Sequence, residues 1–176
     1  MNTDKQPLAH NRFTWESLSN IEKGRGDLGT EMPVLVYRLM QYTMLDVLNQ
    51  DCGAERANGY FRQAGYSAGM EFAKHMLDLT AEFSGFLADL QRTLRELKIG
   101  ILRMESYAED TGEIVLTVAE DLDCSGIPVT NETVCCYDEG FIKGVLEAYT
   151  GEKYTVREID CWANGDRVCR FRGTRG

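Results

Sequence analysis

The chain has few histidines and none of the short motifs that mark common enzyme families. It contains two histidines, His10 and His75, which nearly excludes a hydrolytic metal site built on imidazole ligands. We find no GxGxxG loop, no Walker loop and no nucleophile elbow. No carboxylate pair has a helical spacing that suggests acid–base chemistry. The sequence therefore names no catalytic residue and favours a non-catalytic protein.

Basic side chains are also scarce. There are 19 Lys and Arg against 28 Asp and Glu, a formal net charge of −9. Nucleic-acid binding needs basic surface, and so does docking to anionic lipid, so neither is expected. From Met104 to Ile142 there is no Lys or Arg. The acids of this stretch predict either a solvated face or a docking face for a basic partner: Glu105, Glu109, Asp110, Glu113, Glu120, Asp121, Asp123, Glu132, Asp138 and Glu139.

The chain lacks a secretory signal and a long hydrophobic run. Its longest apolar stretch, 33–48, is interrupted by Arg38, Gln41 and Asp46, so we expect no membrane span and a cytoplasmic protein. In that compartment cysteines are thiols or metal ligands more often than disulfides. The six are Cys52, Cys124, Cys135, Cys136, Cys161 and Cys169.

The 176 residues suit one domain with a short leader. We expect a partly ordered leader at 1–29 and a domain at 30–173. Apolar periodicity predicts helices near 30–49, 54–78, 80–97 and 132–149, and hairpins at 99–118 and 154–172. This order predicts an α+β fold, with helices packed on one face of an antiparallel sheet of about four strands.

Two of these helices have unusual surfaces. Apolar residues cover most of the 33–49 helix, while Arg38 and Gln41 lie on its narrow polar side. So wide an apolar arc predicts deep burial between helices or in a subunit interface, and we expect a homodimer through this helix. In the 54–78 helix, Gly65, Ala68 and Gly69 are small enough for another backbone to approach closely, or for a cavity.

Thiols gather towards the C-terminus. Cys135, Cys161 and Cys169 together with the Glu158 carboxylate could complete a tetrahedral zinc site; the alternative is buried thiols that fill strand positions. If the final hairpin turns at Asn164-Gly165 alone, Cys161 and Cys169 point to opposite faces. A metal site therefore needs a three-residue loop or a bulge.

The same segment carries a family pattern. Cys135 precedes Gly140 and Gly144, and then follows Val156-x-Glu-x-x-Cys-x-x-x-Gly-Asp-x-x-Cys-x-Phe171. This resembles the four-vinyl reductase (4-vinyl reductase) domain family, also called predicted hydrocarbon-binding proteins. The resemblance extends over about 30–173. It implies a fold similar to transport-particle tethering subunits and haem nitric-oxide-binding domains, with several helices on an antiparallel sheet.

The resemblance also implies a ligand site. Related sensor domains of aromatic-responsive activators bind phenol-like ligands beside a zinc held by three Cys and one Glu. The matching positions here are Cys135, Glu158, Cys161 and Cys169, and four protein ligands make the zinc structural. The neighbouring Cys136 could be the zinc ligand in place of Cys135.

For the pocket we expect Tyr66, Phe72, His75 and Trp162, although aromatics at helical spacing are more often simply core. His75 would be a polar handle there, or a haem ligand as in the distant relatives; a haem is not expected. The predicted function is binding or sensing of a small apolar molecule (hydrocarbon, aromatic or lipid-like), with a separate output protein. The alternatives are an accessory protein or reductase acting on tetrapyrrole vinyl groups, and a non-enzymatic tethering subunit.

Overall fold

The computed structural model describes residues 13–18 and 20–176 and divides the chain into two compact units, 1–30 and 31–176. The described part of the first unit holds a 3-10 helix, η1 (Trp15–Leu18), and one short helix, α1 (Ile21–Gly24). The rest of the predicted leader, 1–12 and residue 19, lies outside the described residues. All features below belong to the second unit.

The second unit is built on a four-stranded antiparallel sheet. Its strands are β1 (Ile101–Ala108), β2 (Glu113–Ala119), β3 (Tyr154–Asp160) and β4 (Cys169–Arg175), in the order β1-β2-β4-β3. Residues along β3 are alternately buried and exposed, so one face of the sheet is covered. The helices are α2 (Val34–Cys52), α3 (Ala54–Met76), α4 (Phe83–Glu96) and α5 (Cys136–Thr150). The predicted α+β class and antiparallel sheet are confirmed.

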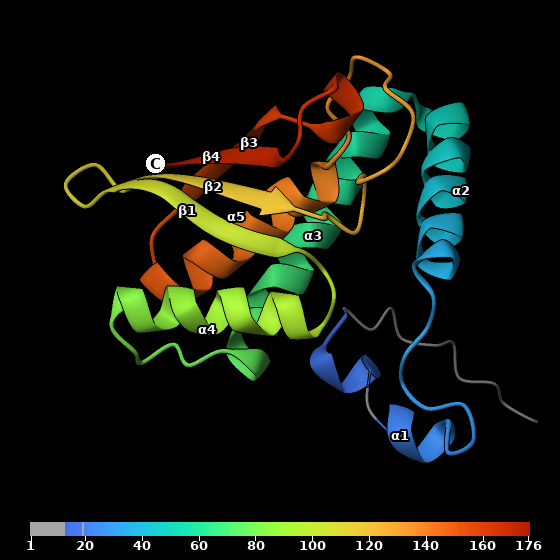
Figure 1. Cartoon of the computed structure of the whole chain (residues 1–176), viewed down its shortest axis with the longest axis horizontal. Coiled ribbons are helices and arrows are strands. Elements are labelled where there is room, and N and C mark those ends of the chain that lie inside the picture. The colour runs from blue at the N-terminus through green and yellow to red at the C-terminus, as the bar shows by residue number, and fades with distance from the viewer. Residues whose placement is uncertain (1–12, 19) are drawn as a thin grey trace, which may run out of the picture. The chain divides into compact units, whose positions relative to one another are not determined.

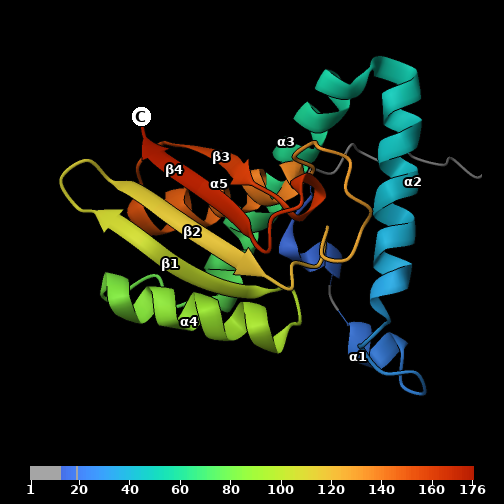
Figure 2. The same ribbon diagram turned by 45° about the horizontal axis from the view of Figure 1, so that its top comes forward.

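Helices α4 and α5 pack on the covered face of the sheet, and α3 packs against α5 (Figures 1 and 2). In α4 the apolar residues recur every three or four positions, and Phe86, Leu87, Leu90 and Leu94 are buried. Phe86 stacks on Tyr149 of α5 with ring centroids 3.9 Å apart. The sheet and these two helices therefore enclose a common apolar layer.

Glycines allow α3 and α5 to touch backbone to backbone. A Cβ atom on Gly65 would collide with the carbonyl of Tyr137, and one on Gly140 would collide with the carbonyl of Arg62. Gly69 and Gly144 meet the opposite helix in the same way. The small residues noted in the sequence of α3 thus face matching glycines of α5, and the crossing is close enough to exclude any side chain.

Helix α2 does not bury its apolar arc within the chain. Deep burial within the chain is wrong, since α2 has no buried residue. Its polar side faces the protein instead: Arg38 Nε donates to Leu122 O at 2.8 Å, and Tyr37 Oη donates to Asp123 Oδ1 at 2.7 Å. The apolar arc therefore faces outward, and Leu35 and Leu39 are 74% and 64% exposed. The alternative prediction, a subunit interface, stays a prediction.

Replacing Gly140 by Ala should destabilise the fold by about 1–3 kcal/mol, because the added methyl group forces α3 and α5 apart. The matched control is Gly59→Ala in α3, which has open space around it and should gain up to about 1 kcal/mol of stability. Urea denaturation measures both. Equal midpoints for the two variants would show that the crossing is not tight.

Candidate ligand and metal site

Four cysteine side chains converge at one end of the sheet. The Sγ atoms of Cys124, Cys135, Cys161 and Cys169 all lie within 4.8 Å of one another, and each residue is at most 1% exposed. Cys135 Sγ lies 3.9 Å from that of Cys161 and 3.8 Å from that of Cys169, while the sulfurs of Cys124 and Cys169 are 3.1 Å apart. All six cysteines of the chain are free thiols.

The spacing fits a tetrahedral metal ion. Zinc–sulfur bonds of about 2.3 Å at tetrahedral angles place the sulfur atoms about 3.8 Å apart. The two separations from Cys135 match this value, and the Cys124–Cys169 pair would need to widen slightly. A soft thiolate set without histidine suits zinc. The donor set and its geometry therefore fit a closed structural zinc site.

Each cysteine is placed by its own local structure. Asp121 Oδ1 accepts the backbone N–H groups of Asp123 and Cys124, which folds the loop after β2 into a turn. Cys135 is the N-cap of α5. Cys169 is the first residue of β4. The cluster thus joins a loop, a helix end and a strand end that are far apart in sequence.

The segment that carries Cys161 differs from both predicted hairpin turns. Eight residues, 161–168, connect β3 to β4, and a 3-10 helix, η2 (Trp162–Asn164), lies within them. The register of β3 shifts by a bulge between Glu158 and Asp160. Cys161 O accepts the N–H groups of Asn164 and Asp166, so the chain curls around this residue. The bulge that a metal site required is present.

The thiols influence one another's protonation. Hydrogen bonds from Cys124, Cys135 and Cys169 lower the pKa of Cys161, whereas hydrogen bonding to Cys124 and Cys161 raises the pKa of Cys135. Cys161 is therefore the thiol of the cluster whose deprotonation the other three favour most. A soft cation binds the thiolate form and displaces protons from the remaining thiols.

Three of the four predicted ligands lie in this cluster, and the fourth lies beside it. Glu158 Oε2 accepts the backbone N–H of Cys135 at 3.1 Å, and its other oxygen is buried without a hydrogen-bond partner among the described residues. Burial raises the pKa of Glu158 to about 8, with Cys161 adding to the shift. Cys136 is outside the group of four, near Arg62 and Glu139. The sequence analysis did not include Cys124 among the metal ligands. The Asp121-Leu-Asp-Cys pattern, which is typical of a turn, was the signal that could have indicated it.

An apolar cavity of about 40 Å³ lies next to the cluster, between α4, β1, β2 and α5. Its walls are side chains of the common apolar layer, together with two carboxyl groups, those of Asp121 and Asp138. The apolar lining residues are Leu90, Leu94, Ile99, Gly100, Leu102, Leu116, Val118, Leu122, Phe141, Ile142, Val145 and Leu146.

The two carboxyl groups connect the cavity to the thiols. One oxygen of Asp121, one oxygen of Asp138 and Cys135 Sγ lie within 4.8 Å of one another. Burial raises the pKa of Asp121 to about 7, and Asp123 adds to the shift. Burial also raises the pKa of Asp138 well above its ordinary value, with Asp123 and Asp121 adding to it. The cavity therefore has one polar, acidic corner in an otherwise apolar lining.

Among the four residues predicted to line a pocket, none lines this cavity. Phe72 contacts a lining residue, since its ring lies 5.1 Å from that of Phe141 in an edge contact. His75 Nδ1 lies 2.8 Å from Glu71 O on its own helix. Trp162 Nε1 donates to Ile127 O at 3.0 Å. Ligand contacts by these residues and by Tyr66 stay a prediction.

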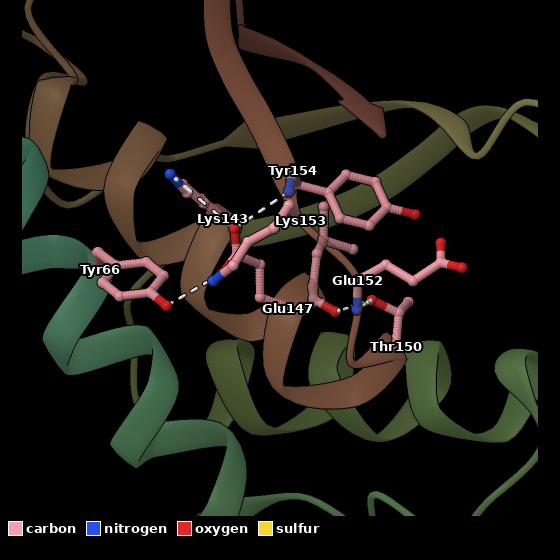
Figure 3. Close-up of polar contacts among 8 residues, drawn as sticks. Tyr66, Lys143, Glu147, Thr150, Glu152, Lys153 and Tyr154 are labelled. Carbon is pink, nitrogen blue, oxygen red and sulfur yellow. Dashed lines mark hydrogen bonds and ion pairs between the residues drawn. The ribbon is translucent and has the colours of Figure 1, made fainter. Parts of the chain in front are cut away.

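Tyr66 instead belongs to a polar link between α3, α5 and β3 (Figure 3). Its hydroxyl donates to Glu147 Oε2 at 3.0 Å, and Lys153 Nζ and the N–H of Tyr154 also donate to this carboxylate. About two helical turns nearer the cluster, Glu139 bridges the same three elements through Arg62 and the N–H of Glu158. Both carboxylates orient α5, which carries Asp138 and follows directly from Cys135.

The acidic stretch is not one surface. Asp121, Asp123 and Glu139 are buried, at 4%, 3% and 6% exposure, and serve the loop and the helix links described above. The prediction of a continuous solvated or docking face over 104–142 is therefore wrong for these acids.

Among the described residues, no helix has both the length and the apolar character of a membrane span.

Comparison with known families bears on the segment that carries all four clustered cysteines. Residues 114–175 match the model of the 4-vinyl reductase domain family. This match confirms the resemblance drawn from the cysteine and glycine pattern. An uncharacterized protein of Methanocaldococcus jannaschii is 25% identical over 156 residues, covering 89% of this chain and 83% of that protein. The transcriptional regulatory protein XylR of Pseudomonas putida is 28% identical over 131 residues, 69% of this chain and 23% of XylR.

Solved structures share the fold around the matched segment. The phenol-responsive sensory domain of the transcription activator PoxR, solved with phenol, has a TM-score of 0.63 at 19% identity, covering 84% of this chain and 78% of that chain. A vinyl-4-reductase family protein of M. jannaschii has a TM-score of 0.59 at 13% identity, with 85% of each chain covered. Trafficking protein particle complex subunit 3 of Naegleria fowleri, covalently bound to palmitic acid, has a TM-score of 0.61 at 15% identity, covering 82% of this chain and 97% of that chain.

Glu147→Gln should destabilise the protein by about 1–3 kcal/mol at neutral pH, because the buried link loses its charge. Burial alone would raise the pKa of Glu147, but the bonds from Lys153, Tyr154 and Tyr66 lower it. Its contribution is therefore present above the unfolded pKa and is lost as the pH falls through the folded pKa. Denaturation of both proteins between pH 7 and 3 should show their stabilities converging in acid. A constant difference would contradict the assignment.

Proposed function

We propose that this chain is a sensing module for a small apolar molecule, such as a hydrocarbon, an aromatic compound or a lipid-like ligand. The cavity between α4, β1, β2 and α5 carries the proposal, because its lining is almost wholly apolar. PoxR, whose sensory domain responds to phenol, and XylR, a transcriptional regulator, support a sensory role. We further propose that the signal passes to a separate output protein.

The cavity must expand to accept such a ligand. At about 40 Å³ it is smaller than the cavity of about 150 Å³ that admits benzene in a protein core. Leucine side chains form much of the wall and can change rotamer. A tetrapyrrole is far larger than either volume, so the cavity favours small ligands over the vinyl reductase alternative.

Filling the cavity should weaken ligand binding. Val145→Phe places a larger side chain in the wall, and we expect at least about a tenfold loss of affinity for toluene. Val129→Phe, at a loop position that is 57% exposed, is the matched control and should bind like the parent. Isothermal titration calorimetry measures both. Unchanged binding by Val145→Phe would place the ligand elsewhere.

The proposed zinc is structural. Cys135, Cys161 and Cys169 supply three ligands, and the fourth position falls to Cys124, which lies in the cluster, or to Glu158, which has an unpartnered buried oxygen beside it. Four protein ligands leave no open coordination position, so the ion would cross-link the loop, the helix end and the hairpin without taking part in catalysis.

The natively purified protein should contain about one zinc per chain, and Cys161→Ser should lose it together with thermal stability. Cys136→Ser is the control that should keep the metal. Substitution with cobalt(II) then identifies the fourth ligand. Cys124→Ser changes the thiolate charge-transfer absorption only if Cys124 binds the metal. Glu158→Gln changes the ligand-field bands only if the Glu158 carboxylate binds it. Metal-free parent protein would overturn the zinc proposal.

The outward face of α2 supports a homodimer. Leu35, Leu39, Met40, Met44 and Val47 are each at least 53% exposed and follow one side of the helix. A gathering of exposed apolar side chains on one helix is typical of an interaction site. The tethering alternative rests on the acidic stretch 104–142 and not on this face, which the pairing of two copies covers without any further partner.

Placing charges on this face should produce monomers. The double variant Leu39→Glu, Met44→Glu puts four carboxylates into a symmetric interface, so the parent should sediment as a dimer and the variant as a monomer. Asn49→Glu, on the same helix, is the charge control and should remain dimeric. A monomeric parent, or a dimeric double variant, would contradict the assignment of this face.

A further inference from the structure

The acidic corner of the cavity has no partner within the described part of the chain. Asp138 Oδ2 is buried and accepts no hydrogen bond from the described residues, although the rest of α5 is closely packed. Buried acceptors are nearly always paired, so an unpaired one beside a cavity marks the place of a missing donor. Because Asp138 lines the cavity, that donor can belong to a ligand.

Asp121 is fixed in the same corner. Its Oδ1 atom accepts the N–H groups of Asp123 at 2.8 Å and Cys124 at 3.3 Å, which holds the carboxyl plane in place. An oxygen of Asp121 lies within 4.8 Å of one of Asp138. A single head group placed between the two residues can therefore reach both carboxyls.

Positive charge is missing from the described surroundings of this corner. Arg38 is the basic residue that contacts the loop, but its guanidinium is engaged by the backbone carbonyls of Asp121, Leu122 and Ser125. Every other cavity-lining residue is apolar, so apart from a proton held by the carboxyl pair itself no side chain of the wall can donate to it. The electrostatic complement of the corner is a cation that carries several N–H donors.

We propose that the cavity binds apolar primary amines, with the ammonium group between Asp121 and Asp138 and the hydrocarbon portion among the leucines of α4 and the sheet. This inference rests on the proposed apolar-ligand function and specifies its ligand class. An ammonium group offers three donors to two carboxyls, whereas a phenol or alcohol offers one and a hydrocarbon none. A carboxylic acid is excluded, because it would add a third acid to the corner.

A metal ion is the competing occupant, since Cys135 Sγ lies within 4.8 Å of the same oxygens. The amine is favoured because the open space beside the carboxyl pair is lined by hydrocarbon, which a small hydrated cation cannot use. Cys135 also lies among the other three thiols. The two occupants give different results in the experiment below.

The experiment compares four probes of similar shape: benzylamine, benzyl alcohol, toluene and benzoate, titrated into the full chain by calorimetry at constant ionic strength. We expect benzylamine to bind at least about tenfold more tightly than benzyl alcohol or toluene, and benzoate not to bind. Asp138→Asn keeps the shape of the side chain and should remove the preference for benzylamine over toluene. Asp110→Asn, in the exposed turn between β1 and β2, should behave as the parent.

The outcomes separate this inference from the function it rests on. Toluene binding as tight as benzylamine binding would overturn the amine proposal and leave the apolar pocket intact. Failure of all four probes would overturn both. A second zinc per chain that disappears in Asp138→Asn would assign the corner to a metal and also overturn the proposal. If Asp138→Asn does not fold, as judged by circular dichroism, Asp121→Asn tests the same prediction.

Discussion

The convergence of four buried thiols is the contact on which the rest of the site depends. Cys124, Cys135, Cys161 and Cys169 come from the loop after β2, the start of α5, the turn after β3 and the start of β4. These segments have no disulfide between them, and much of their backbone is irregular. Cys135 holds the start of α5 at the cluster, three residues before Asp138 of the carboxyl corner.

The loop of residues 121–125 is shared by three features. Asp121 and Leu122 line the cavity, Cys124 belongs to the thiol cluster, and Arg38 and Tyr42 of α2 bind the backbone of the loop. A ligand that moves Asp121 therefore shifts groups that contact both the cluster and the proposed dimer helix. The chain thus provides a contiguous set of contacts from the cavity to α2, which gives the proposed sensing function a physical route.

Local patterns were sufficient to predict the secondary structure, because the strict alternation in β3 and the helical spacing in α4 reflect short-range geometry. The spacing of Cys161 and Cys169 left open whether they share a face, and the family pattern was what grouped them with Cys135. The paired glycines of α3 and α5 were visible as small residues. These features depend on periodicity, which a single sequence displays.

Other features depend on tertiary arrangement and were missed. Cys124 joins the cluster only because Asp121 folds its loop, and Asp138 faces the cavity only because Glu139 and Glu147 fix the rotation of α5. For α2, the amphipathic pattern alone does not tell which face contacts the rest of the chain. In a monomer the apolar arc would face inward, whereas in a dimer it can face outward, toward the second copy. The cavity itself follows from packing among four elements, which no linear pattern encodes.

The most direct test of this account is amide hydrogen exchange of Cys161→Ser, read by mass spectrometry over the whole chain. If the thiols hold the site together, exchange should accelerate in 121–125 and at the start of α5 as well as in 161–168, while α4 stays as protected as in the parent. Cys52→Ser, a thiol outside the cluster, is the control. Acceleration confined to 161–168 would contradict the account, because the other segments would then be held in place independently of the thiols.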